Sequence, residues 1–218
     1  MTIPFQIVGF DLDGTLLDTS RDLGAAVNHA LALIGRESVA HEAISGLIGG
    51  GARLMLQRAL MLTGGAQDID QDRLFAQLLG YYETHIADYT EPYPGAVAML
   101  DKLAEAGIKL AVVTNKREPM ARLPFDTLGL SARFTCIIGA GRYSLKPAPD
   151  ALLAMVRDCG GGRAAYVGDT TFDTRAAKAA GLTSVAVSFG FIDAPIAELG
   201  ADAVIDHFDQ LVPTLARL

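Results

Sequence analysis

The chain has 218 residues with 50% hydrophobic content, and it carries a formal net charge of −7 at pH 7. Its length fits one large domain, or one domain with an insertion, and its apolar content is ample for a sizeable core. The acidic balance argues against a nucleic-acid partner, because nucleic-acid phosphates require a basic surface, but it leaves room for a small anionic substrate.

The first predicted element is a short buried strand that ends in two aspartates. Residues 6–10 are predicted to form this strand, and Asp11 and Asp13 follow it. Because side chains alternate between the faces of a strand, the two carboxylates can point the same way, and they then need a cation or a shared proton. We interpret Asp11 as a nucleophile, Asp13 as an acid/base and both as magnesium contacts. The alternative is an ordinary turn through Gly14, whereas a calcium loop is rejected because Gly14 comes too early for that pattern.

A helical region is expected to follow. Thr19 or Ser20 can cap the first helix, and Gly35 is a plausible stop after an apolar stripe at helical spacing. Residues 42–89 then contain no convincing strand pattern. Within them, helices are predicted over residues 54–62 and 74–86.

The helical region is interpreted as an insertion in the fold. Residues 90–95 contain two prolines and a glycine, which predict a turn-rich hinge. We expect residues 18–92 to form a helical cap domain over the end of the first strand, and residues 1–17 and 93–218 to form the α/β core. Both connections, at residues 17–20 and 90–95, are expected to act as hinges when the cap closes.

Helices and apolar strands alternate in the remainder of the chain. This alternation predicts a doubly wound, Rossmann-like core, in which a parallel sheet carries helices on both faces. The predicted helices cover residues 96–106, 119–128, 150–156 and 172–180, and the predicted strands cover residues 108–113, 136–138, 164–167, 183–187 and, at one edge, 203–205.

Cysteine usage and hydropathy favour a cytoplasmic protein. Cys136 and Cys159 have no Cys-x-x-Cys or histidine companions, so neither a zinc site nor a disulfide framework is expected. Residues 1–4 lack the basic start of a secretory signal, and no apolar run approaches the roughly 18 residues that a membrane helix needs. We therefore expect no membrane partner.

Polar residues are expected to meet at the carboxyl edge of the sheet, where ligands bind in such folds. Thr114 offers a hydroxyl and the backbone N–H groups after it suit a phosphate oxygen. Lys146, held extended by Pro147, offers a point charge. Asp169 ends a buried strand, and Asp173 shares its face of the next helix. Each residue also has an ordinary interpretation, as part of a turn, as a solvated lysine or as a complement to the helix dipole.

Taken together, these side chains predict a magnesium site. Four aspartates and a threonine are hard oxygen ligands of the kind that magnesium prefers. Four carboxylates that face a phosphate dianion require such a cation. We expect Mg²⁺ as the cofactor, with Asp11, Asp13, Asp169 and Asp173 as its contacts.

The order and spacing of these residues resemble the haloacid dehalogenase-like superfamily, and specifically its phosphatases, over nearly the whole chain. Residues 10–16 are similar to the first motif of that family, residues 113–116 to the second, Lys146-Pro147 to the third and residues 168–173 to the fourth. All four motifs in order, with a helical insertion after the first, are highly specific.

The resemblance implies a role for each matching residue. Asp11 attacks phosphorus to form an aspartyl-phosphate, while Asp13 protonates the leaving oxygen and then activates water. Thr114 and Lys146 hold the phosphoryl group. Asp11, the backbone carbonyl of Asp13 and Asp169 bind Mg²⁺, and Asp173 supports the metal site or orients Lys146. Family dehalogenases lack a carboxylate at the position of Asp13, so its presence favours phosphoryl transfer.

The helical cap is expected to choose the substrate. Residues 48–53 resemble the cap motif of phosphoglycolate phosphatases, although Gly50 replaces a frequent asparagine and the fourth motif has Phe172 where a polar residue is common. Gly50 and Gly51 expose N–H groups that can take a small carboxylate, and Arg53 adds charge. The alternatives are a flexible hinge and a solvated arginine. Asn115, beside Thr114, is a further candidate contact.

The leading prediction is a Mg²⁺-dependent phosphatase that converts 2-phosphoglycolate to glycolate and phosphate. A sugar-phosphate phosphatase, a pyrophosphatase and a phosphoglucomutase-like enzyme of the same superfamily remain alternatives. A non-catalytic phosphate-binding protein is a further alternative from another class. The expected partner is a small phosphate ester, and the protein is expected to be a monomer or a dimer.

Overall fold

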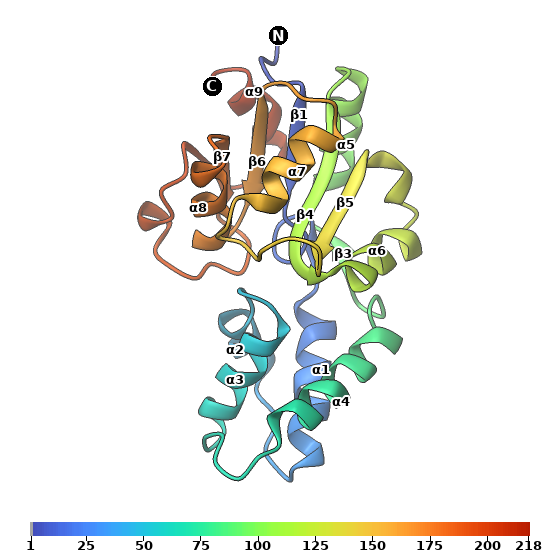
Figure 1. The fold of residues 1–218 in the computed structure, drawn as a ribbon, viewed down its shortest axis with the longest axis vertical. Coiled ribbons are helices and arrows are strands. Elements are labelled where there is room, and N and C mark those ends of the chain that lie inside the picture. Colours follow the sequence, from blue (N-terminus) through green and yellow to red (C-terminus); the bar gives the residue numbers. More distant parts are fainter. Residues whose placement is uncertain (1) are drawn as a thin grey trace.

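The centre of the larger part of the molecule is a parallel sheet. The computed structural model describes residues 2–218, and within them six strands pair in the order β5-β4-β1-β6-β7-β8. The strands are β1 (Ile7–Phe10), β4 (Lys109–Arg117), β5 (Cys136–Ala140), β6 (Ala164–Gly168), β7 (Thr183–Val187) and β8 (Ala203–Ile205). Every predicted strand is present, and Figure 1 shows the sheet flanked by helices.

Helices cover both faces of this sheet, which confirms the doubly wound α/β prediction. One face packs Val8 and Phe10 against α5 (Ala96–Glu105), α6 (Glu118–Thr127) and α9 (Leu211–Leu215). The opposite face packs Ile7 against α7 (Asp150–Asp158) and α8 (Thr171–Ala179). Neighbouring residues of β1 are buried on opposite sides, as expected of a strand covered on both faces.

Strand β4 is longer than predicted. The prediction that it ends at Val113 was wrong, because the strand continues to Arg117, which pairs with Ala140 of β5. The register shifts between Val113 and Arg117. Thr114, Asn115 and Lys116 therefore lie in an irregular stretch of the strand, and such irregularities are frequent beside functional sites.

The smaller part of the molecule is helical and has its own core. It contains α1 (Ser20–Leu33), α2 (His41–Ile44), α3 (Ala52–Leu62) and α4 (Gln71–Thr84), which lie beyond the carboxyl ends of the sheet strands (Figure 1). Buried residues such as Leu31, Leu60 and Leu78 form a separate hydrophobic cluster there. Among residues 2–218, no helix combines the length and the apolar character that a membrane crossing requires.

The two segments that join the parts lie side by side. Leu17–Asp18 (β2) pairs antiparallel with Glu91–Pro92 (β3), a pairing that the turn-like sequence did not predict. Nearby, the carboxylate of Asp22 accepts hydrogen bonds from the backbone of Tyr89 and from both the backbone and the hydroxyl of Thr90. The connections are thus tied together, whereas their action as hinges and the division into two domains stay predictions.

The start of α1 differs from the prediction in one functional detail. Thr19 occupies the N-cap position, but its side chain makes no capping hydrogen bond. Its hydroxyl instead donates to Asp13 Oδ1 at 2.7 Å, and the carboxylate of Asp18 accepts the backbone N–H of Ser20. The Thr19 side chain, which was expected to cap α1, therefore supports Asp13, a candidate catalytic residue.

Candidate active site

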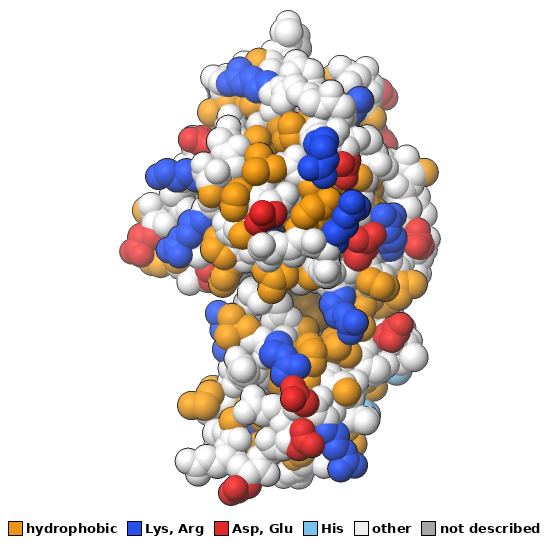
Figure 2. Space-filling view, in the orientation of Figure 1, with side chains coloured by type: hydrophobic (Ala, Val, Ile, Leu, Met, Phe, Trp, Pro, Cys, Tyr) orange, Lys and Arg blue, Asp and Glu red, His pale blue; other side chains and the backbone are white. Residues whose placement is uncertain are grey.

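A cavity of about 230 Å³ lies between the carboxyl edge of the sheet and the helical part. Figure 2 shows the narrowing between the two parts, with hydrophobic side chains inside it and basic side chains at its margin. The predicted site residues that line the cavity are Asp11, Asp13, Gly50, Gly51, Arg53, Thr114, Asn115, Lys146 and Asp169. Asp173 lies behind them, in contact with Lys146.

Lys146 is a buried cation at the bottom of this cavity. Its side-chain nitrogen lies 2.8 Å from Asp11 Oδ1 and 2.6 Å from Asp173 Oδ1. It also donates to the Val113 carbonyl and the Tyr166 hydroxyl. Burial alone would lower the pKa of Lys146, but the neighbouring carboxylates of Asp11 and Asp173 raise it well above its usual range. Lys146 is therefore a permanent positive charge beside the candidate nucleophile.

Both carboxylate oxygens of Asp173 accept hydrogen bonds from neighbouring residues. Its Oδ1 accepts from Lys146, and its Oδ2 accepts from the backbone and the hydroxyl of Thr170 in a capping box at the start of α8. Gly168 makes this possible, because a Cβ at that position would overlap the side chain of Asp173. Of the two roles predicted for Asp173, these contacts favour the orientation of Lys146.

Three buried carboxylates form a cluster that fits a divalent cation. Asp11, Asp169 and Asp173 each place an oxygen within 4.8 Å of the others. Asp11 Oδ1 is in ion-pair contact with Lys146, but it accepts no hydrogen bond within the part of the chain that the structure describes. Carboxylate oxygens at this spacing, one of which accepts no hydrogen bond, are the hard donors that Mg²⁺ prefers.

The raised pKa values of two of these carboxylates also indicate a cation site. Burial raises the pKa of Asp11 to about 6 in spite of the opposing charge of Lys146. Burial, together with the charges of Asp173 and Asp11, also raises the pKa of Asp169 well above its usual range. Keeping these carboxylates ionised is therefore unfavourable without a further cation.

Asp169 is fixed by groups from two loops. Its Oδ1 accepts the Thr15 hydroxyl at 3.1 Å, and its Oδ2 accepts the Phe191 N–H at 2.6 Å. Gly14 has φ of +83°, and a Cβ there would strike both Asp169 and the ring of Phe191. Gly14 and Thr15 therefore allow the loop after β1 to approach Asp169, at the end of β6, closely.

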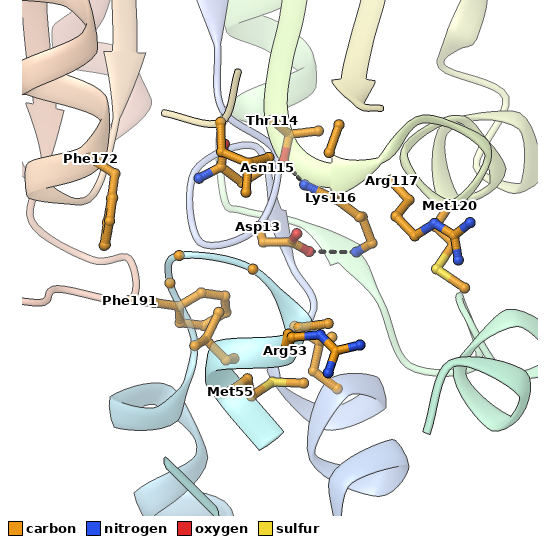
Figure 3. A pocket seen from close by; sticks show the side chains of 18 of the residues that line it. Asp13, Arg53, Met55, Thr114, Asn115, Lys116, Arg117, Met120, Phe172 and Phe191 are labelled. Carbon is orange, nitrogen blue, oxygen red and sulfur yellow. Dashed lines mark hydrogen bonds and ion pairs between the residues drawn. The ribbon is translucent and has the colours of Figure 1, made fainter. Parts of the chain in front are cut away.

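Asp13 is held apart from the carboxylate cluster. Its Oδ1 accepts the Thr19 hydroxyl at 2.7 Å. The same oxygen accepts the Lys116 side chain at 2.6 Å, a contact marked in Figure 3. Burial opposes the charge of Lys116, but Asp13 and the Tyr82 hydroxyl raise its pKa above its usual range. The side chain of Asp13 is thus oriented toward the cavity, and a metal contact through its backbone carbonyl stays a prediction.

The side chain of Asn115 is engaged within the protein. Its amide nitrogen donates to the Lys146 carbonyl at 3.0 Å, and its oxygen accepts the Lys146 N–H at 2.8 Å. This pair of bonds fixes the loop that presents Lys146. Thr114 is buried beside it, and its hydroxyl accepts the Lys116 N–H at 3.2 Å. The amide of Asn115 is therefore better suited to positioning Lys146 than to contacting a substrate.

The predicted cap residues lie at the helical side of the cavity. Gly50 and Gly51 line it directly before α3. Arg53 pairs with Asp72 at 2.8 Å, stacks on Phe75, and leaves 52% of its side chain exposed. Its charge is thus partly compensated at the margin of the cavity.

The two departures from the family pattern are neighbours in space. A Cβ on Gly50 would lie 3.2 Å from the ring of Phe172 and closer still to the Leu54 side chain. Gly50 and Phe172 both line the cavity. The glycine therefore leaves room for the phenylalanine ring.

Sequence reasoning missed the contact that joins the two parts across the cavity. Lys116, from β4, donates to the hydroxyl of Tyr82, from α4, at 2.5 Å. The sequence around Tyr82 indicates only a residue that packs within a helix. The one available signal was the Thr-Asn-Lys order of the second motif, which places Lys116 beside the predicted phosphate ligand.

Known proteins resemble this chain over nearly its whole length. The profile of a family described as haloacid dehalogenase-like hydrolase matches residues 8–187. A phosphoglycolate phosphatase of Agrobacterium fabrum is 39% identical over 211 residues, covering 94% of this chain and 90% of that protein. Another from Mesorhizobium japonicum is 38% identical over 215 residues, covering 97% and 95%. The crystal structure of a predicted phosphoglycolate phosphatase from Haemophilus somnus superimposes with a TM-score of 0.89 at 28% identity, covering 97% of this chain and 98% of that one.

Proposed function

This chain belongs to the haloacid dehalogenase-like hydrolase family and is a phosphoric monoester hydrolase, and on that premise we propose that it hydrolyses 2-phosphoglycolate. The observation that carries the proposal is the position of Asp11. Its carboxylate lies at the bottom of the cavity beside the buried Lys146, and Asp13 follows two residues later. The products are glycolate and inorganic phosphate.

The first half-reaction transfers the phosphoryl group to Asp11. A carboxylate oxygen of Asp11 attacks phosphorus while the bond between phosphorus and the ester oxygen breaks. Asp13 gives its proton to the leaving oxygen, so that glycolate departs as an alcohol. Lys146 and Thr114 hold the phosphoryl oxygens, and Asp173 keeps Lys146 in place.

The second half-reaction regenerates the enzyme. The Asp13 carboxylate accepts a proton from water as the water oxygen attacks phosphorus. The bond between phosphorus and Asp11 breaks, which releases inorganic phosphate and restores the Asp11 carboxylate. Thr19 and Lys116 orient Asp13 for both steps.

Mg²⁺ is the cofactor that this donor set suits. Asp11, Asp169 and the backbone carbonyl of Asp13 would hold it, and Thr15 and Phe191 would keep Asp169 oriented. When bound, it supplies positive charge that offsets the repulsion between the carboxylates and the phosphate. The unsatisfied Asp11 oxygen and the raised pKa of Asp169 support this assignment.

The substrate assignment is supported by similarity and by size. The two relatives named above carry the name phosphoglycolate phosphatase at 39% and 38% identity. The cavity of about 230 Å³ suits a small ester. The backbone N–H groups of Gly50 and Gly51, together with Arg53 at the margin of the cavity, suit an anionic leaving group.

The direct test is phosphate release by the purified protein. 2-Phosphoglycolate, glucose 6-phosphate and pyrophosphate are compared with Mg²⁺ and with EDTA. We expect Mg²⁺-dependent release with the highest kcat/KM for 2-phosphoglycolate. An Asp11→Asn variant, whose fold is checked by circular dichroism, should release none. A clear preference for another ester would refute the substrate, and release in EDTA would refute the metal requirement.

A further inference from the structure

Lys116 is a buried cation that faces the cavity but lies outside the group that holds the phosphoryl oxygens. Its side chain is 6% exposed. It contacts Asp13 Oδ1 at 2.6 Å and the Tyr82 hydroxyl at 2.5 Å, and it lies 4.7 Å from the centre of the Tyr82 ring. The phosphoryl site already has its own buried lysine, Lys146, so the charge of Lys116 is left to serve another part of the substrate besides supporting Asp13.

The position of Lys116 relates it to the leaving group. The proposed mechanism places the ester oxygen against Asp13, and Lys116 touches the same carboxylate (Figure 3). In 2-phosphoglycolate, the carboxylate carbon is two bonds from that oxygen, each about 1.5 Å long. A substrate whose ester oxygen meets Asp13 therefore brings its carboxylate to the vicinity of the Lys116 ammonium.

Among the described residues that line the cavity, no other basic side chain is equally placed for this task. Arg53 already pairs with Asp72 and is half-exposed. Arg117 is exposed, and its guanidinium points away from Asp13 in Figure 3. The cavity wall contributed by the helical part around Tyr82 is apolar, with Met55, Leu78 and Leu79. A carboxylate that enters this half of the cavity thus leaves water and needs a cation there.

Lys116 retains the capacity to bind such a group. A lysine ammonium has three N–H donors, and the described residues supply two acceptors, Asp13 and the Tyr82 hydroxyl. The third donor is available to a ligand in the cavity that Lys116 lines. Tyr82 comes from α4 of the helical part, so its bond to Lys116 also fixes the ammonium relative to the cap.

We propose that Lys116 determines substrate specificity by binding the carboxylate of the leaving group, and that Tyr82 positions Lys116 for this contact. This inference rests on the proposed function, because it concerns the leaving group of the same reaction. It restricts the substrate class to small phosphate esters with an anionic group next to the ester carbon. An ester with a neutral leaving group of similar size makes no such ion pair, so the enzyme hydrolyses it less efficiently.

The test compares two small esters, one with a charged leaving group and one with a neutral leaving group. 2-Phosphoglycolate carries a carboxylate where 2-hydroxyethyl phosphate carries a neutral hydroxymethyl group. The readout is the ratio of their kcat/KM values with Mg²⁺ present, for the wild type and for Lys116→Met. Loss of the support that Lys116 gives to Asp13 affects both esters and cancels in this ratio.

We expect the wild type to prefer 2-phosphoglycolate. Lys116→Met should lower the ratio about 10- to 100-fold, the range for one lost hydrogen bond between charged groups. Lys116→Arg should retain part of the preference, because it keeps the charge. Tyr82→Phe, which removes one hydroxyl, should lower the ratio less than Lys116→Met. Arg117→Gln, the matched control for a neighbouring basic residue, should leave it unchanged.

The possible failures are distinguishable. If the wild type prefers 2-phosphoglycolate and Lys116→Met leaves the ratio unchanged, the role of Lys116 is overturned while the proposed function stands. If the wild type prefers 2-hydroxyethyl phosphate, both are overturned. If Lys116→Met does not fold, Tyr82→Phe and Lys116→Arg decide the matter, and an unchanged ratio in both overturns the inference.

Discussion

Magnesium is expected to stabilise this protein at neutral pH and to lose that effect at acidic pH. Burial raises the pKa of Asp11 from its ordinary 3.8 to about 6. A difference of this size corresponds to about 3 kcal/mol of unfolding free energy, at 1.36 kcal/mol for each pKa unit. Ionised Asp11 in the metal-free folded protein therefore costs about 3 kcal/mol at neutral pH.

The direction of the pH dependence follows from which state holds the proton more tightly. Below about pH 4 the Asp11 carboxyl is protonated in both states and carries no penalty. Between about pH 4 and pH 6 the folded protein keeps a proton that the unfolded chain has released, so the free energy of unfolding falls as pH rises. A cation in the cluster favours the ionised form and offsets this loss above about pH 6.

Denaturant unfolding followed by circular dichroism measures this effect. The free energy of unfolding is compared in EDTA and in saturating Mg²⁺ at about pH 7.5 and about pH 4.5. In EDTA, the difference between the wild type and Asp11→Asn should change by about 2 kcal/mol between these two pH values, because asparagine does not titrate and part of the Asp11 penalty is already present at about pH 4.5. Asp169→Asn, which removes a proposed ligand, should lose the Mg²⁺ increment. An equal increment at both pH values, or parallel pH curves for the wild type and Asp11→Asn, would refute the reasoning.

Two further substitutions separate the buried ion pairs from the exposed ones. Lys146→Met leaves the buried carboxylates of Asp11 and Asp173 without their cation, so it should lower the metal-free free energy of unfolding by about 3–5 kcal/mol. A loss below about 1 kcal/mol in urea would mean that the carboxylates find other compensation. Arg53→Gln breaks an ion pair whose side chains are 52% and 86% exposed, so the same measurement should change by less than about 1 kcal/mol. A larger loss would show that the stacking of Arg53 on Phe75 contributes to the fold.

The residues around Asp11 were predictable because a simple rule governs parallel sheets. Asp11 and Asp169 each end a buried strand, and β1 and β6 are neighbours in the sheet. Carboxyl ends of parallel strands lie at one edge, so strand order alone brings these side chains together. Lys146 followed from its place in a loop on the same edge. The helical and strand periodicities gave the fold for the same reason, since burial on both faces leaves continuous apolar runs.

The contacts across the cavity were not predictable in this way. Lys116 meets Asp13 across 103 positions and Tyr82 across 34 positions of the chain. Nothing in local periodicity distinguishes Lys116 from a solvated lysine. Nor does it show that the hydroxyl of Tyr82, a residue of α4, has a bonding partner outside the helix. These pairings depend on how the helical part sits over the sheet, which is a property of the whole fold.

Two short or irregular elements were also not predictable from the sequence. The β2–β3 pair consists of two residues on each side, and Pro92 within it resembles a turn. The extension of β4 beyond Val113 passes through Thr114 and Asn115, which by composition suggest the end of a strand. In both cases tertiary hydrogen bonding overrides local preference.

Trapping of the phosphorylated enzyme tests the central claim most directly. Wild-type protein is mixed with phosphorus-labelled 2-phosphoglycolate and Mg²⁺, quenched in acid within a turnover, digested and mapped by mass spectrometry. We predict that the label lies on Asp11 and is absent from the Asp11→Asn variant. Phosphate release without a labelled peptide, or label on any other residue, would contradict nucleophilic attack by Asp11.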